Sequence, residues 1–476
     1  MDPVTATALA LEATAPDAPG VLVMVSCDLS GLSDALRAAV RDRLRQRLPE
    51  LDPAMVVFNA THTHTGPMAN SHDRYTPTLQ SHTGAEYGVD FGGMDTADYI
   101  AFAADRIAGA IIHAWENRAP GGIAYGLGFA VVGRNRLTAY RDGTSKMCGP
   151  VNHPEFSHME GGADPSLHVL ATYDTDRRLT GLVLNLACPS QISEQAMRVS
   201  ADYWHEVREE LHRRHGATLH ILAQCAPAGD QSPHLHGSEC RRPRQTAGRE
   251  NPEVRMWRLA GRSQREEIGT RIADAVATVL PLIEKEMDWT PRFAHRVETV
   301  ELPRRLIPET DVEQSREEAA AMRVQYETLM LELESDPRRR DDPEWKRATS
   351  RAFQLMRRSE KVVERFERQK IHPKLSLEIH VARLGDVAFA TNPFEFYLDY
   401  GLQIQARTRC VQAFLVQLAG PGSYVPTERS IRGGAFGTVP ASTEIGPAGA
   451  HELVEWTIAA ANAFWDEAKP AEGNGP

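Results

Sequence analysis

The stretch that decides the fold runs from residue 20 to residue 60. It opens with "GVLVMVSC" (20–27), a continuous apolar run of the length expected for a buried strand. "SDALRAAVRDRLRQRL" (33–48) follows, with apolar residues at helical spacing and Ser33 placed as an N-cap. "MVVFNA" (55–60) is the next strand-like run. This succession of strand, helix and strand predicts a parallel or mixed sheet with helices packed against it.

The same pattern continues along the chain and predicts an α/β (α+β) fold, a mixed multi-stranded sheet core flanked by helices. We expect β-structure over 121–143, a β-hairpin over 168–188, further strands over 218–227, 375–391 and 410–420, and helices over 97–116, 202–215, 251–286, 396–409 and 451–467. Residues 310–370 are rich in charged, helix-forming residues and contain Pro337 and Pro343, which predicts an inserted two-helix hairpin. The domain prediction is one domain formed by 1–305 and 371–469, an insertion over 306–370, and a disordered tail over 470–476.

Composition narrows the class of protein. The 476 residues carry a net charge of -11, which argues against a broad nucleic-acid surface because phosphate binding needs clustered Lys and Arg. No run reaches the length of an apolar membrane span, and the N-terminus shows no secretory leader. Six scattered cysteines without a CxxC pair do not form a disulfide framework. We therefore expect a cytoplasmic protein with a small-molecule partner.

Polar side chains follow four of the predicted strands, at the point where each strand ends. They are His62 and His64 in "FNATHTHTGP" (58–67), Ser232 in "APAGDQSPHLHG" (226–237), Glu395 in "ATNPFEFYLDYG" (390–401) and Tyr424 in "GPGSYVPTERS" (420–430). Each segment alone has an ordinary interpretation as a loop or turn. The carboxyl ends of parallel strands can converge, and open α/β sheets bind ligands there. Their shared position favours one site, whether a metal centre, an acid/base pair or both.

Three of these segments together resemble a known family. "SCDLSGL" with "VVFNATHTHTGP", "AGDQSP" and "GSYVPT" are similar to the corresponding motifs of the neutral ceramidases, and the similarity extends over roughly 1–300 and 375–450. The resemblance implies a zinc-dependent amidase that cleaves an N-acyl bond, with one zinc ion per chain. It also implies a catalytic domain without the family's C-terminal immunoglobulin-like domain.

The resemblance assigns roles residue by residue. It implies that His62, Glu395 and Tyr424 contact zinc and that His64 lies beside the reacting carbonyl. It places Ser232 at the family's GDxSP serine and Arg136, in "GRNRL", at a substrate-holding arginine. We further expect Asp230, His158 and His205 to line the substrate pocket.

The chain departs from the family's pattern at two further positions. Cys188, in "NLACPSQ", stands where the family's remaining zinc histidine is expected, and Phe436 replaces a second tyrosine. A thiolate is a good zinc ligand, so the metal shell is either His62, Cys188, Glu395 and Tyr424, or one in which His205 or His64 takes the place of Cys188.

These residues predict a metal-dependent hydrolase in which activated water attacks an amide, with His64 transferring a proton and Tyr424 and Arg136 stabilising the oxyanion. A soluble amide is favoured over ceramide. Two alternatives stay open: hydrolysis of an ester or glycoside on the same scaffold, or a non-catalytic relative that binds metal or ligand. The sequence is also compatible with a homo-oligomer, since the charged hairpin can serve as a cap or as an interface.

Overall fold

The computed structural model describes residues 2–14, 19–69, 88–89, 93–196, 198–235 and 251–466. Three larger sheets form its centre. The first has the order β1-β2-β3, built from β1 (Ala6–Ala13), β2 (Gly20–Cys27) and β3 (Val56–Ala60). As predicted, β2 and β3 run parallel, and β1 pairs antiparallel with β2.

The second sheet has the order β11-β10-β9-β4 and the third β13-β14-β15-β17. Pairing is parallel between β10 and β11 and between β15 and β17, and antiparallel within the rest of both sheets. Their strands are β4 (Gly121–Phe129), β9 (Ser166–Asp174), β10 (Leu179–Leu186), β11 (His220–Cys225), β13 (Phe293–Pro303), β14 (Lys374–Leu384), β15 (Val387–Thr391) and β17 (Gln412–Val416). The mixed α/β class predicted from the sequence is confirmed.

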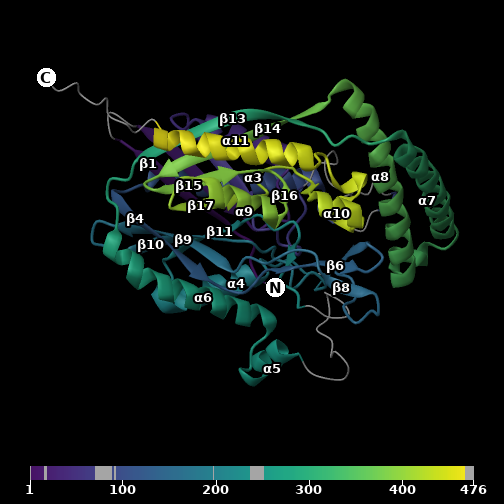
Figure 1. Cartoon of the computed structure of the whole chain (residues 1–476), viewed down its shortest axis with the longest axis horizontal. Coiled ribbons are helices and arrows are strands. Elements are labelled where there is room, and N and C mark those ends of the chain that lie inside the picture. The colour runs from purple at the N-terminus through teal and green to yellow at the C-terminus, as the bar shows by residue number, and fades with distance from the viewer. Residues whose placement is uncertain are drawn as a thin grey trace.

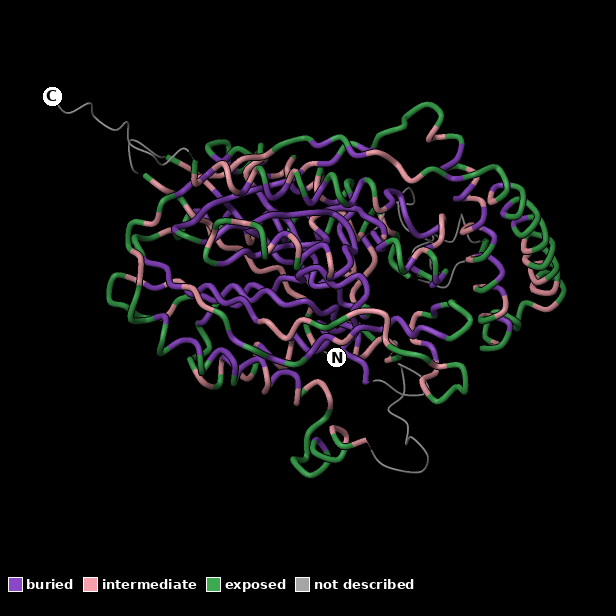
Figure 2. Tube along the Cα trace, viewed as in Figure 1, coloured by how far each residue is buried: buried purple, intermediate pink, exposed green. Residues whose placement is uncertain are grey.

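The inner faces of the three sheets share one apolar core. Leu22, Leu170, Val183, Leu222 and Phe414 come from all three sheets and pack in a single cluster. Figure 2 shows this buried centre running along the length of the molecule, with exposed residues confined to the periphery. Burial on both faces explains why these strands read as continuous apolar runs.

The outer face of each sheet is covered by a pair of helices that supply their own apolar stripes (Figure 1). The pairs are α1 (Asp34–Arg47) with α3 (Thr96–Glu116), α4 (Tyr203–His215) with α6 (Gln264–Ile283), and α9 (Leu398–Arg407) with α11 (Pro447–Asp466). The Ser33 hydroxyl caps α1 by accepting the Leu36 N–H, as predicted. The single helix expected over 251–286 is instead α5 (Pro252–Leu259) and α6, separated by Gly261 with φ +66.

The inserted hairpin is present as α7 (Glu309–Ser335) and α8 (Pro343–Ile371). It stands at one end of the molecule, beside α10 (Glu428–Gly433), β6 (Leu137–Tyr140) and β8 (Phe156–Met159) in Figure 1. Arg358 of α8 lies with its guanidinium carbon 4.2 Å from the centroid of the Phe436 ring. The hairpin therefore packs against the segment that follows Tyr424. The predicted tail over 470–476 lies outside the described residues.

Candidate active site

The predicted convergence of strand ends is present, and its centre is the contact between His62 and Glu395. His62 follows β3, and Glu395 begins the short strand β16 (Glu395–Phe396), which follows β15. The His62 Nε2 atom lies 3.4 Å from Glu395 Oε2, and both residues are buried. Residues distant in sequence thus meet where their strands end, as open α/β sheets allow.

The backbone holds His62 in an unusual conformation. Its φ is 61°, in the left-handed region that non-glycine residues seldom adopt. The preceding residue, Thr61, is fixed on both sides, because its N–H donates to the Cys27 carbonyl and its hydroxyl donates to Asp28. Asp28 is in turn bound by both terminal nitrogens of Arg208 at 2.7 and 3.0 Å. Such strain persists where surrounding contacts over-determine it, as at functional sites.

His62 uses one ring nitrogen toward the backbone and presents the other to a carboxylate. Its Nδ1 lies 2.5 Å from the Ser30 carbonyl, which only accepts, so Nδ1 carries a proton. The Nε2 atom is thereby directed at Glu395, either as a proton donor in an ion pair or, when unprotonated, as a ligand for a cation shared with the carboxylate. A nitrogen and an oxygen that share a tetrahedral zinc ion are separated by about the same distance, given bonds of about 2.0–2.2 Å.

Tyr424 supplies a third donor to this centre. It lies in the short strand β18 (Tyr424–Val425), which pairs parallel with β16 so that Glu395 and Tyr424 are register partners. Its hydroxyl hydrogen-bonds Glu395, and the pKa of Tyr424 is raised, first by burial and then by the Glu395 charge. A cation at this position would bring the phenol pKa down again.

Arg136 places a fixed cation beside both oxygens. Its Nη2 lies 3.8 Å from Glu395 Oε2 and 3.3 Å from the Tyr424 hydroxyl, and it donates to the Gly229 carbonyl at 2.9 Å. Its Nη1 donates to Gln191 Oε1 at 3.3 Å. Burial alone would raise the pKa of Glu395, but His62 and Arg136 together hold that pKa below its ordinary value.

The structure buries Cys188, the predicted fourth ligand, among apolar side chains. Cys188 packs in the apolar cluster between the second sheet and helices α4 and α6, and its thiol lies 3.5 Å from the Pro189 carbonyl. Among the described residues, no group of three or more His, Cys, Asp or Glu is arranged to hold a metal ion. The donors that converge are therefore two of those types, His62 and Glu395, with the Tyr424 hydroxyl as the third.

His64 lies next to this centre but does not complete it. The rings of His62 and His64 meet edge to face, with centroids 4.9 Å apart. The His64 side chain is 32% exposed, so it is open on one side, whereas His62 is enclosed. Burial lowers the pKa of His64, which favours the neutral imidazole.

Ser232 and Asp230 hold the framework of the site. Ser232 pairs with Arg134 across β12 (Gln231–Ser232) and β5 (Arg134–Asn135), and its hydroxyl accepts the His234 backbone N–H at 3.2 Å. The Asp230 carboxylate accepts the Leu398 N–H at 2.9 Å at the start of α9, and the Asn135 amide at 2.8 Å. These bonds engage both oxygens of the Asp230 carboxylate, and the Asp230 backbone carbonyl accepts the Arg136 N–H at 2.9 Å, so Asp230 supports Arg136. Its predicted contact with a substrate stays a prediction.

The two other histidines predicted to line the substrate pocket have local contacts. His158 is exposed in β8, and its Nδ1 lies 3.0 Å from the hydroxyl of its neighbour Ser157. His205 lies in the first turn of α4, where its N–H donates to the Asp202 carbonyl. Their contact with a substrate stays a prediction.

Sequence reasoning missed two residues of the site, Gln191 and Glu194. Both lie on the loop after β10, and Glu194 Oε2 lies 3.4 Å from His64 Nδ1. One signal could have found them. Because β10 is parallel to β11, the loops after both strands leave the same edge of the sheet, and polar residues on either loop are candidates for the site.

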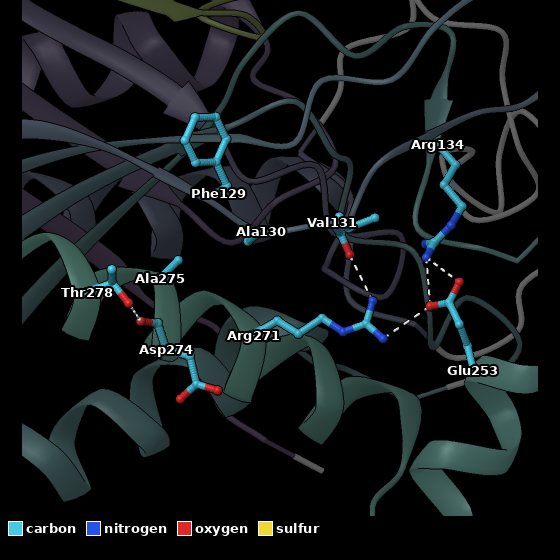
Figure 3. A pocket seen from close by; sticks show the side chains of 9 residues that line it. All are labelled: Phe129, Ala130, Val131, Arg134, Glu253, Arg271, Asp274, Ala275 and Thr278. Atoms are coloured by element: carbon cyan, nitrogen blue, oxygen red, sulfur yellow. Dashed lines mark hydrogen bonds and ion pairs between the residues drawn. The ribbon is translucent and has the colours of Figure 1, made fainter.

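A surface hollow is lined by other residues than those of this centre. A pocket of about 510 Å³ is lined by residues of the β4 end and α6, together with Arg134 and Glu253. Figure 3 shows Arg134 and Arg271 both directed at the Glu253 carboxylate, which they bind at 2.8 and 3.1 Å. Because these charges already neutralise one another, this hollow offers no comparable chemistry.

The fold and site define a mixed α/β protein with a buried His–Glu–Tyr–Arg centre at its strand ends, and comparison with known proteins supports this class of fold. No protein-family model matches the chain. Among curated proteins, the neutral ceramidase of Pseudomonas aeruginosa is 26% identical over 290 residues, which span 57% of this chain and 39% of that protein. The chain thus matches well under half of that relative's length.

Solved structures extend the similarity to nearly the whole fold. A crystal structure of neutral ceramidase from Pseudomonas aeruginosa superposes with a TM-score of 0.61 at 17% identity, covering 97% of this chain and 69% of that one. A ceramidase complexed with C2 gives a TM-score of 0.60 at 16% identity, covering 99% and 71%. The chain is thus similar to the neutral ceramidases in part of its sequence and in most of its fold.

Proposed function

We propose that the protein is a metal-dependent hydrolase of N-acyl amide bonds, with zinc held by His62, Glu395 and Tyr424. The observation that carries the proposal is the His62–Glu395 contact, in which Nε2 faces a carboxylate oxygen at 3.4 Å while Nδ1 is engaged by the Ser30 carbonyl. The ring orientation of His62 is fixed from behind by the Ser30 carbonyl, as second-shell partners fix the histidines that bind metals. Three protein donors with one open position are the pattern of catalytic zinc.

Lewis acidity toward the scissile carbonyl and toward an attacking water is what such an ion supplies when bound. The chain's own residues supply the remaining groups. Arg136 presents a preorganised guanidinium to the position of the developing oxyanion, where fixed donors act most strongly. Its bonds to Gly229 and Gln191 hold that guanidinium in place without reorganisation.

His64 is the group placed to move a proton. It is partly open to solvent and adjacent to His62, so one ring nitrogen can reach a substrate bound at the centre. Burial lowers its pKa, so the ring can accept the proton that the attacking water releases. It then delivers that proton to the leaving nitrogen of the amide, whose amine is otherwise a poor leaving group.

The substrate is a small molecule whose acyl chain or amine part contacts Phe436 beside Tyr424. The two rings meet edge to face with centroids 6.4 Å apart, and Phe436 is 51% exposed. Among the described helices, none has the length and apolar character needed to cross a bilayer.

The test is hydrolysis of matched chromogenic probes by the zinc-loaded protein: an N-acyl p-nitroanilide, the corresponding p-nitrophenyl ester, a p-nitrophenyl glycoside, and a ceramide with a labelled acyl chain. We expect cleavage of amides that is lost with a chelator and restored by zinc. Cleavage of the glycoside alone, or of no probe by the refilled protein, would contradict the proposal.

A further inference from the structure

A second polar cluster adjoins the proposed centre and is centred on Glu194. One carboxylate oxygen, Oε2, lies 3.4 Å from His64 Nδ1, and the other, Oε1, lies 3.4 Å from His234 Nε2. The Glu194 and His234 side chains are 9% and 8% exposed. Three loops contribute, since His64 follows β3, Glu194 follows β10 and His234 follows β11.

The contact with Glu194 favours one tautomer of His64. An ionised carboxylate only accepts hydrogen bonds, so the Nδ1 atom that faces it carries a hydrogen, which leaves the lone pair on Nε2. His234 Nε2 lies 3.4 Å from the other carboxylate oxygen, without a hydrogen bond between these two atoms. The two rings lie beside different oxygens, so the two contacts do not compete.

We propose that Glu194 is a positioning residue that sets the tautomer and ring orientation of His64, with His234 holding Glu194 from the opposite side. The inference deepens the proposed function, on which it rests, by naming the group that prepares His64 to accept or deliver a proton through Nε2. Carboxylate–imidazole pairs serve this purpose in hydrolases, where an incorrect tautomer is costly.

The burial pattern distinguishes this role from that of an ordinary stabilising pair. Burying a carboxylate costs free energy unless polar or charged partners lie close to it. His64 and His234 are such partners for Glu194. The gradient runs from His234 at 8% exposed, through Glu194 at 9%, to His64 at 32%. The exposed end is the one next to His62, where substrate would bind.

Glu194→Gln is the informative variant because it keeps the volume and one accepting oxygen while replacing the second oxygen with an N–H donor. Glu267→Gln is the matched control. The Glu267 carboxylate lies on α6 and pairs with Arg262, which precedes the helix, and with Arg271 within it. The direct readout is the ¹⁵N spectrum of protein labelled in histidine, with the His64 signals assigned through His64→Asn. This readout does not depend on substrate.

We expect His64 to show the Nδ1–H tautomer in the wild-type protein and in Glu267→Gln, and a mixture or the Nε2–H form in Glu194→Gln. On the best amide probe, kcat should fall roughly 100-fold in Glu194→Gln with KM little changed, and Glu194→Asp should recover part of the loss. His234→Gln should weaken the tautomer preference without abolishing it.

An Nε2–H form of His64 in the wild type, or an unchanged spectrum in Glu194→Gln, would overturn the inference whatever the activity. A confirmed tautomer in a protein that hydrolyses no probe would instead reject the proposed function and leave the pairing intact. A tautomer change with equal losses in kcat for Glu194→Gln and Glu267→Gln would show a structural role and overturn the inference.

Discussion

Glu395 and Tyr424 are register partners in a two-residue parallel ladder, although each follows a different strand of the third sheet. The pairing brings a carboxylate and a phenol next to each other, where Arg136 lies 3.8 Å from the first and 3.3 Å from the second. Backbone geometry, rather than side-chain flexibility, therefore sets the spacing of this centre.

Arg136 should matter more to turnover than to substrate binding. Arg136→Met removes the preorganised guanidinium and leaves Glu395 buried with one fewer cation. We expect kcat to fall by about 10²–10³-fold and the free energy of unfolding to fall by about 3–5 kcal/mol. Arg136→Lys keeps the charge but loses the planar group with two terminal nitrogens, so it should recover stability more than activity. Steady-state kinetics and urea unfolding would check both, and equal recovery of the two would count against a role in the reaction.

Gly229 should be irreplaceable because of a close approach between two loops. A Cβ at this position would lie 2.3 Å from the Glu395 carbonyl oxygen, which is backbone and cannot move aside without moving the ligand. Gly229→Ala should cost about 1–3 kcal/mol and weaken metal binding. Gly109→Ala is the control, since its Cβ would meet nothing within 4 Å on helix α3, and it should stabilise the fold slightly. Thermal melts with metal titration would show the contrast; similar behaviour of the two variants would disprove it.

Stability should fall in mild acid because of a buried histidine away from the site. Burial, and then the neighbouring His380, lower the pKa of His295 to about 4 from 6.5. Above pH 6.5 this residue is neutral in both the folded and the unfolded chain, so it does not change the free energy of unfolding. Between these two values only the unfolded chain takes up the proton, so stability falls by about 1.4 kcal/mol per pH unit.

The variant His295→Gln should flatten this part of the pH profile, measured by urea unfolding. His220→Gln, at an exposed position of β11, is the control and should leave the profile unchanged. A profile that keeps its slope in His295→Gln would exclude His295 as the cause.

Cys188 should behave as a core thiol. Burial raises its pKa well above the ordinary value, with the nearby Cys225 adding to the shift. Iodoacetamide should therefore modify native Cys188 far more slowly than the half-buried Cys148, and peptide mapping would measure both. Cys188→Ala should cost about 1 kcal/mol. Rapid alkylation of native Cys188 would contradict its placement in the core.

The sequence predicted the class of fold and most elements because alternating strand and helix periods survive in this chain. It also predicted that His62, Glu395 and Tyr424 converge, because strand ends in such sheets share an edge. The role of Cys188 stays a prediction. The structure places this thiol in an apolar cluster, and the sequence could not tell which way the side chain faces because the periodic pattern of the strand ends before this residue.

Glu194 is a residue of the site that sequence reasoning did not find. The loop after β10 has no strand-like or helical period, so nothing in its composition distinguishes Glu194 from the exposed Gln195 beside it. Only the three-dimensional positions of His64 and His234 make that carboxylate a partner. Asp230 was assigned to the substrate for a similar reason, since its bonds to Asn135 and Leu398 come from distant segments.

Metal content of the purified protein and of two variants tests the central claim most directly. Elemental mass spectrometry after zinc loading should find about one zinc per chain in the wild type and in Cys188→Ala, and a large loss in His62→Ala. Zinc lost equally from Cys188→Ala would restore the thiol to the shell. A wild-type protein that retains no zinc after loading would contradict a metal centre at His62, Glu395 and Tyr424.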